Sequence, residues 1–303
     1  MMPDIQRHSF RAMASPCEIL LGGLTAAQAQ PLFLAAQEEV ERIEKKYSRY
    51  RKDSLLSQIN DHSLEEPVCC DEETLSLFDN ADVLYHASNG LFDATSGVLR
   101  RVWDFDKQVL PDAAALAEVL ALVEWPAVKR EGNRVSLSRP GMELDFGGFG
   151  KEYAADCAAK VLIDAGATSG YVNLAGDFHV LGPKPTGEPW AIGIRDPLQS
   201  DKIFASISVD KGALTTSGNY ERYFELDGKR YCHILNPLSG YPVNYWRSVS
   251  VLAPKALLAG SFSTISMLVE EQGRDFLEDS GFSFIAINHQ GKIFQKSDSG
   301  INS

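Results

Sequence analysis

The sequence has few cysteines, no excess of basic residues and no long apolar run. Its 303 residues include five cysteines, and 29 basic residues face 41 acidic ones, for a formal net charge of −12. Without a basic face, a general nucleic-acid or anionic-membrane binder is not expected. Nothing approaches the roughly 18 consecutive apolar residues of a membrane-spanning helix, so no membrane span is predicted. The acidic net charge is compatible with a phosphate-containing ligand, because backbone amides and helix N-termini bind phosphate locally.

The cysteines indicate neither a disulfide framework nor a zinc site. Their number is odd, and their spacing fits no zinc pattern. Cys69 and Cys70 are adjacent, which suits neither an easy disulfide nor a CxxC site. We therefore predict reduced thiols. Cys232 lies next to His233 and suggests a nucleophilic role, but neighbours in a strand point to opposite faces, which argues against it.

Apolar periodicity predicts a mixture of helices and mostly antiparallel strands, and so an α+β fold. The 44% apolar and 23% charged composition is ordinary for a globular protein. Helices are expected at 31–47, with Pro31 in the first turn, and at 53–60, 71–87, 112–123, 150–165, 257–269 and 271–279. Strands are expected at 17–23, 127–130, 134–138, 142–146, 170–174, 177–181, 190–195, 203–209, 213–216, 248–253, 282–288 and 292–294, with a hairpin at 221–234. We predict one domain over 1–303, with a polar, mobile tail at about 296–303.

Residues 214–243 hold a concentrated polar motif. The small-hydroxyl segment 215–218 is expected to form a turn that leads into an aromatic strand, 220–224. The Asp227-Gly228 pair predicts a hairpin turn, after which the returning strand delivers His233 just before two further turns. Hydroxyls and backbone amides near one histidine suit a phosphorylated ligand. An ordinary hairpin with turn-favouring residues explains the same pattern, and the residues alone favour it.

A second motif, 147–151, joins an expected strand to an expected helix. Its glycines allow a ligand to approach the backbone closely, and the helix N-terminus offers free N–H groups and a partial positive charge. Lys151 adds a cation, although the spacing is not that of a Walker A loop. A tight strand–helix turn fits equally well.

Two shorter segments also contain candidate ligand contacts. Backbone amides of 173–177 could face a phosphate, or Asp177 could be only a turn former. Asp93 and Thr95 could bond an adenine or ribose edge, or Asp93 could be a helix N-cap.

Taken together, six segments resemble the ApbE family, the flavin transferases that move FMN from FAD onto a protein Thr or Ser. The segments are 47–60, 90–97, 145–156, 173–177, 190–197 and 214–243, and they occur in the family's order. The resemblance implies an α+β domain with a central, mostly antiparallel sheet flanked by helices. Many relatives are exported lipoproteins, whereas residues 1–8 contain no apolar stretch or cleavage site of a signal peptide. A cytoplasmic location is therefore expected, or an exported one if the sequence has been trimmed.

The resemblance also implies roles for individual residues. His233, Lys151 and Thr216 are the expected catalytic residues: His233 activates the acceptor, and the other two position phosphates. Metal binding is expected at Gly148 and Thr264. Contacts to FAD are expected from Met13, Tyr50, Asp93, Thr95, Glu152, Asn173, Ala175, Gly176, Asp177, Ser217 and Gly218.

Three positions depart from the family pattern. Ala175 replaces a glycine, a mild change unless the residue needs a positive φ. Glu152 stands where relatives usually have glycine. Gly260 stands where relatives carry an aspartate that binds magnesium with the residue at Thr264. Because Mg²⁺ usually binds one or two carboxylates, we expect weaker metal binding here, unless Ser261, Ser263, Asp177 or water compensates.

The expected function is therefore a magnesium-dependent FAD:protein FMN transferase that releases AMP. One alternative is an FAD-binding protein with weakened or lost transfer, which Gly260 supports. Another is an enzyme that hydrolyses FAD to FMN and AMP. The expected partners are FAD and an acceptor flavoprotein with a target Thr or Ser, whose identity the sequence does not indicate.

Overall fold

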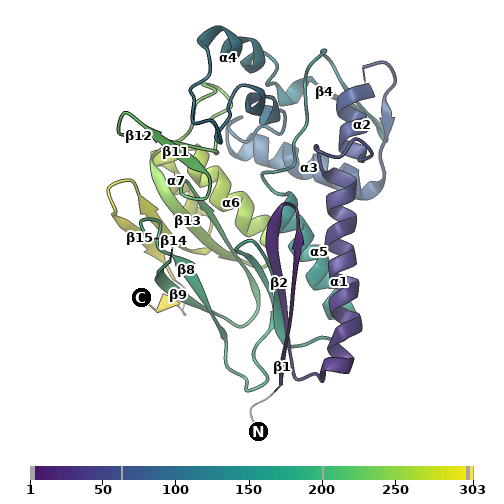
Figure 1. Ribbon diagram of the computed structural model, residues 1–303, viewed down its shortest axis with the longest axis vertical. Coiled ribbons are helices and arrows are strands. Elements are labelled where there is room, and N and C mark those ends of the chain that lie inside the picture. The colour runs from purple at the N-terminus through teal and green to yellow at the C-terminus, as the bar shows by residue number, and fades with distance from the viewer. Residues whose placement is uncertain (1–3, 63, 200, 298–300, 303) are drawn as a thin grey trace.

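The computed structural model describes residues 4–62, 64–199, 201–297 and 301–302. Its centre is an eight-stranded sheet in the order β1-β2-β6-β7-β10-β13-β14-β15, in which every neighbouring pair is antiparallel (Figure 1). Its strands are β1 Ile5–Ala12, β2 Ser15–Gly22, β6 Gly170–Leu174, β7 Asp177–Gly182, β10 Gly212–Gly218, β13 Trp246–Ala253, β14 Ser283–Asn288 and β15 Ile293–Lys296. The predicted α+β fold with a central antiparallel sheet is confirmed.

Helices cover one face of this sheet. The α-helices are α1 Ala26–Tyr47, α2 Leu55–His62, α3 Glu72–Ala87, α4 Ala113–Leu120, α5 Gly150–Asp164, α6 Ala256–Leu268 and α7 Gly273–Asp279. Helix α5 packs on β6 and β7, α6 packs on β10 and β13, and α1 packs against α5 (Figure 1). Alternate strand residues such as Ile19, Val172 and Val251 are buried in this helix-facing core. Among the described residues, no helix is long and apolar enough to cross a membrane.

The opposite face carries a second, smaller sheet of β8 Trp190–Arg195, β9 Ile203–Val209 and β16 Ile301–Asn302. A separate core lies between the two sheets, where Val180 and Leu214 of the large sheet pack with Ile192 and Ile207. The expected tail at 296–303 is therefore partly strand, since Lys296 ends β15 and 301–302 pair with β9. Residues 298–300 and 303 lie outside the described residues.

Two further small sheets lie at the helical end of the molecule. One contains β3 Val68–Cys69, β4 Val128–Glu131 and β5 Arg134–Leu137, and the other is the hairpin of β11 Tyr223–Leu226 and β12 Lys229–Cys232. Short 3-10 helices occur at η1 Ser96–Arg101, η2 Trp125–Ala127 and η3 Glu270–Gln272. In the hairpin, Asp227 and Gly228 have φ of 51° and 74°, so the predicted turn is confirmed. An aromatic cluster around Trp103, Phe224 and Tyr231 ties this hairpin to η1 and α4.

Some element predictions were wrong. Strand β1 was missed because most of its residues are polar and give no apolar alternation. Helix α1 begins five residues earlier than expected, at a capping box of Thr25 and Gln28, so Pro31 lies inside the helix and not in its first turn. The segment 215–218 is not a turn, since it continues β10 and pairs with β13.

Residues 142–146 do not form the expected strand. Their backbone partners come from loops: the Leu144 amide donates to the Asn60 side chain at 2.7 Å, and the Asp145 amide donates to the Ala94 carbonyl at 2.8 Å. Because these side-chain and loop acceptors satisfy the backbone, no neighbouring strand is needed. The segment instead joins Asn60 and Ala94, from two distant motifs, to the residues that precede α5.

Candidate active site

A cavity of about 340 Å³ lies at one end of the large sheet, within the roughly 300–1,000 Å³ of small-molecule sites. Strand β10 extends past the start of β7, so its last residues face this space. The other walls come from the β6–β7 turn, the start of α5, the loop before η1, α6 and the residues after β12. Among its lining residues are Asp93, Gly148, Lys151, Glu152, Ala175, Asp177, Thr216, Ser217, Gly218, His233 and Thr264.

The start of α5 brings a cation into the cavity. No side chain that the structure describes caps this helix, so its N-terminal end is available to an anion. A Cβ atom on Gly148 would lie 2.8 Å from the Phe92 ring, so only glycine fits there. The Lys151 Nζ lies 2.5 Å from the Asp177 carboxylate and 3.8 Å from that of Glu152. Burial lowers the pKa of Lys151, but attraction to Asp177 and Glu152 outweighs it, so the amine stays charged.

Glu152 is buried beside Lys151 and is 6% exposed. Burial raises the pKa of its carboxyl, which the charge of Lys151 only partly offsets. Its Oε2 atom has no hydrogen-bond partner among the described residues. A Cβ atom on Gly260 would lie 2.5 Å from the Glu152 Cγ, so the Glu152 side chain fills the place of any side chain at position 260.

The hydroxyls of β10 pair with hydroxyls of α6 and β13. The Ser217 Oγ lies 2.8 Å from the Ser263 Oγ and 3.1 Å from the Thr264 Oγ1, and the Thr216 Oγ1 lies 2.8 Å from the Ser250 Oγ. Because 215–218 is extended strand and not the predicted turn, Ser217 faces α6, whereas Thr216 lies on the opposite face and pairs with Ser250 of β13. Their oxygens can accept from or donate to a polar ligand.

His233 enters the cavity directly after β12. Its backbone N–H donates to the Arg222 carbonyl at 3.0 Å, and its Nδ1 lies 3.3 Å from the same oxygen. Burial and the charge of Arg100 lower the pKa of His233 to about 4, so the ring is neutral at pH 7 and can accept a proton. Cys232 is buried and outside the cavity lining, as the alternation of a strand predicted, and burial raises the pKa of its thiol to about 11.

Ala175 adopts a backbone conformation that favours glycine. It has φ of 58° in the β6–β7 turn, and the following Gly176 has φ of 101°. We expect Ala175→Gly to stabilise the fold by about 1 kcal/mol, because the left-handed conformation costs an L-residue about 1–2 kcal/mol, partly offset by the greater chain entropy of glycine. Urea unfolding would measure this, and a loss of stability would contradict it.

Comparison with known proteins gives the family. The model of the ApbE family matches residues 13–286. The chain belongs to the ApbE family. A relative in Vibrio cholerae named FAD:protein FMN transferase is 32% identical over 240 residues, covering 77% of this chain and 72% of that protein. A protein of the same name in Treponema pallidum is 34% identical over 254 residues, covering 76% and 70%.

Solved ApbE structures share the fold. The crystal structure of the ApbE protein from Thermotoga maritima gives a TM-score of 0.88 at 29% identity and covers 97% of both chains. The flavin transferase ApbE from Vibrio cholerae gives a TM-score of 0.85 at 27% identity, covering 99% of this chain and 96% of that one. The resemblance that the sequence motifs indicated is thus confirmed.

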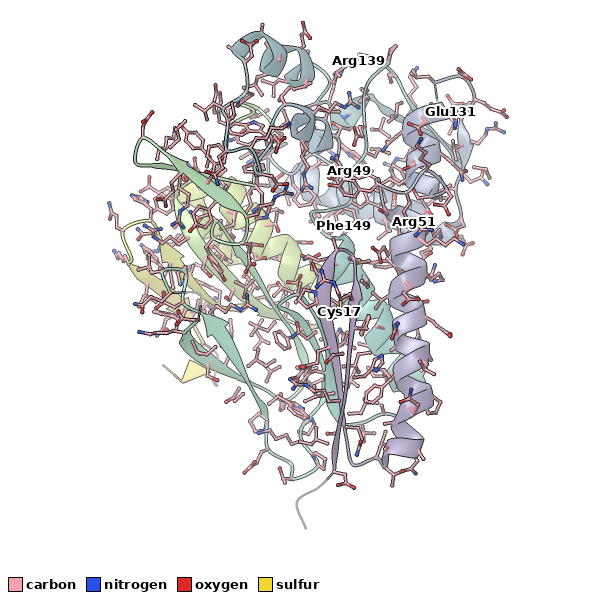
Figure 2. The ribbon with its side chains drawn as sticks, in the orientation of Figure 1. Cys17, Arg49, Arg51, Glu131, Arg139 and Phe149 are labelled. Carbon is pink, nitrogen blue, oxygen red and sulfur yellow. The ribbon has the colours of Figure 1, made fainter. Side chains whose placement is uncertain are left out.

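The ApbE motifs converge on the cavity through Arg49. Its guanidinium donates to the Gly97 carbonyl at 2.9 Å and lies 3.6 Å from the Asp145 carboxylate, which joins three motifs. In Figure 2, Arg49 and Phe149 lie near the upper end of α1. Tyr50, the neighbour of Arg49, is 74% exposed, so it is not a core residue.

Asp93 lines the cavity, but its carboxylate is already engaged. Its Oδ1 accepts from the Thr95 amide at 2.7 Å and the Thr95 hydroxyl at 2.6 Å, and its Oδ2 accepts from the Trp125 amide at 2.9 Å. Asp93 is nevertheless not the N-cap of η1, which is Thr95 and has no side-chain cap, so the expected capping role is wrong. Its carboxylate instead forms a turn with Thr95 and joins that loop to Trp125 of η2.

Five residues expected to contact FAD lie outside the cavity lining, namely Met13, Tyr50, Thr95, Asn173 and Gly176. Asn173 instead accepts from the Gly176 amide at 2.8 Å and so shapes the β6–β7 turn. Contacts of these five with FAD remain predictions. The cavity also contains Arg100, Asp145 and Glu221, which were not singled out. The signal for Asp145 and Glu221 was their place in the motifs 145–156 and 214–243, whereas Arg100 gave none.

Oxygen donors in the cavity fit a divalent cation. Thr264 provides a hydroxyl, and Glu152 provides a buried carboxylate oxygen that has no hydrogen-bond partner in the described part of the chain. A second acidic group lies elsewhere, where ligand atoms of Glu39, Glu73 and Cys157 come within 4.8 Å of one another. Its carboxylates already pair with Arg42 and Lys46, so this group is an ion-pair network.

Proposed function

We propose that this chain is an FAD:protein FMN transferase, which moves FMN from FAD to a threonine or serine of an acceptor protein and releases AMP. Membership of the ApbE family and the names of the relatives support it. One observation carries the proposal for this chain. Lys151 of α5, Ser217 of β10, His233 after β12 and Thr264 of α6 line one cavity. A cation, hydroxyls and a neutral histidine together suit phosphoryl transfer.

In the proposed reaction, the acceptor hydroxyl oxygen attacks the FMN-side phosphorus of FAD. A new phosphorus–oxygen bond forms as the bond to the bridging oxygen breaks, and AMP leaves with that oxygen. His233, neutral at pH 7, takes the hydroxyl proton. Lys151 and the N-terminus of α5 stabilise the phosphate charge, while Thr216 and Ser217 orient the oxygens.

Magnesium belongs to the same proposal. When bound, it neutralises charge on the diphosphate. The residues that would hold it are Gly148, through its main chain, and the side chains of Thr264 and Glu152, all of which line the cavity.

The test is mass spectrometry of a threonine-containing acceptor domain after incubation with this protein, FAD and Mg²⁺. We expect the acceptor to gain the mass of one FMN, with AMP released in equal amount, because transfer cleaves the diphosphate once. EDTA should abolish the addition. The control acceptor carries alanine in place of the target threonine and should stay unmodified.

Two outcomes would contradict the proposal. Release of FMN and AMP without addition to the acceptor would indicate an FAD-hydrolysing enzyme. FAD that remains bound and intact with two unrelated acceptors would indicate a binding protein.

A further inference from the structure

Glu152 and Gly260 lie side by side on two neighbouring helices. Glu152 is in the first turn of α5, Gly260 is in α6, and the two helices pack together. A Cβ atom at position 260 would lie 2.5 Å from the Glu152 Cγ and 2.9 Å from its Oε1. One side chain at most therefore fits at this point between the two helices, and in this chain it is a carboxylate from α5.

This carboxylate lies next to the other hard oxygen donors. Gly260 and Thr264 are four residues apart in α6 and so share the helix face against which Glu152 packs. Glu152 and Thr264 both line the cavity. Lys151 pairs mainly with Asp177, since its Nζ lies 2.5 Å from that carboxylate. The charge of Glu152 is therefore only partly neutralised by Lys151. Among the described residues, the Glu152 Oε2 has no hydrogen-bond partner, which is costly for a buried carboxylate unless it is protonated or a cation binds there.

We propose that Glu152 supplies the carboxylate ligand of the divalent cation, in the place that an aspartate at position 260 would otherwise occupy. The ligand has moved from α6 to α5, and glycine at 260 is what makes room for it. Position 260 is therefore not a lost ligand, and Gly260→Asp alone should not improve metal binding. The inference rests on the proposed function for the role of the metal.

Binding of Mn²⁺ alone, followed by the loss of its free electron paramagnetic resonance signal, tests this without any transfer step. We expect Glu152→Gln, which keeps the shape of the side chain, to weaken Mn²⁺ affinity by about tenfold or more. The double variant Glu152→Gly/Gly260→Asp restores a carboxylate from α6 and should return to within about threefold of wild type. Glu221→Gln removes the same charge from the same cavity and should change affinity by less than about threefold.

Each outcome decides the inference. It is overturned if Glu152→Gln binds Mn²⁺ like the wild type, if Glu221→Gln loses as much affinity, or if the wild type binds no Mn²⁺. Gly260→Asp that binds more tightly than wild type would also overturn it. FMN transfer with unchanged Mn²⁺ binding in Glu152→Gln leaves the proposed function standing. Mn²⁺ binding that depends on Glu152, without FMN transfer, supports the inference and contradicts the proposed function.

Discussion

Replacing His233 with alanine is expected to lower kcat/KM for FMN transfer by about 10²–10⁴-fold, the usual range for loss of a general base. The ring is neutral at pH 7, lines the cavity and is held by the Arg222 carbonyl, so it is placed to take a proton. FAD affinity should change little, because Lys151, the hydroxyls of β10 and the start of α5 remain. Steady-state transfer kinetics and FAD titration measure the two effects separately.

The control is His86→Ala, which removes an exposed histidine of α3 that does not line the cavity. Its kinetics should match the wild type. Equal transfer by His233→Ala and wild type would show that another group removes the proton. Weaker FAD binding with unchanged kcat would show that His233 acts by binding alone.

The acid limb of the pH profile of kcat/KM should lie at a lower pH than an ordinary histidine would give. The pKa of His233 is about 4, so its proton-accepting form persists above pH 4 and is lost only as the pH falls below it. Burial is the main cause, followed by the charge of Arg100, with smaller effects of Lys151 and Arg222. The pH dependence of kcat/KM reports the pKa values of the free enzyme. The titration of His233 should therefore leave kcat/KM unchanged between pH 8 and about pH 5. An acid limb near pH 6.5, the ordinary histidine value, that disappears in His233→Ala would contradict this.

The local signals in the sequence were sufficient for much of the fold. The helix expected at 71–87 is α3, whose Asp71 side chain accepts from the Thr74 amide as an N-cap. Segments without such a signal were missed or misassigned. Strand β1 is mostly polar, and 142–146 obtains its backbone partners from residues 60 and 94. Strand β1 is held by a hairpin with β2 that its polar residues do not signal, whereas the partners of 142–146 lie in distant parts of the chain.

The candidate active site, like the fold, could be predicted only where the sequence carries a local signal. Motif residues such as Lys151, Ser217, His233 and Thr264 were found because each lies in a recognisable segment, and the fold brings them into one cavity. The contact between positions 152 and 260 could not be found that way. The two departures looked independent in the sequence, whereas the structure makes each a condition of the other. From the sequence alone, Gly260 was interpreted as a missing metal ligand, because Glu152, the side chain that we propose compensates for it, lies more than a hundred residues away.

Lys151→Met is expected to weaken both the fold and FAD binding. It leaves Asp177 and Glu152, which are 4% and 6% exposed, without their shared cation. Removing one partner of a fully buried pair costs about 3–5 kcal/mol. Since the Lys151 side chain is 34% exposed, we expect a smaller loss in the free energy of unfolding, about 2 kcal/mol. Urea unfolding without FAD isolates the effect on the fold from that on binding.

A double variant separates the lost pair from lost packing. Adding Asp177→Asn to Lys151→Met removes the uncompensated charge, so the double variant should be more stable than Lys151→Met alone by about 1 kcal/mol. Lys160→Met is the matched control, because Lys160 lies on the same helix and its partner Asp164 is exposed, and it should leave stability unchanged. If the double variant is less stable than Lys151→Met, the uncompensated charge of Asp177 is not what destabilises that variant. In that case the charge of Lys151 serves the ligand, and FAD affinity should fall in Lys151→Met even where stability does not.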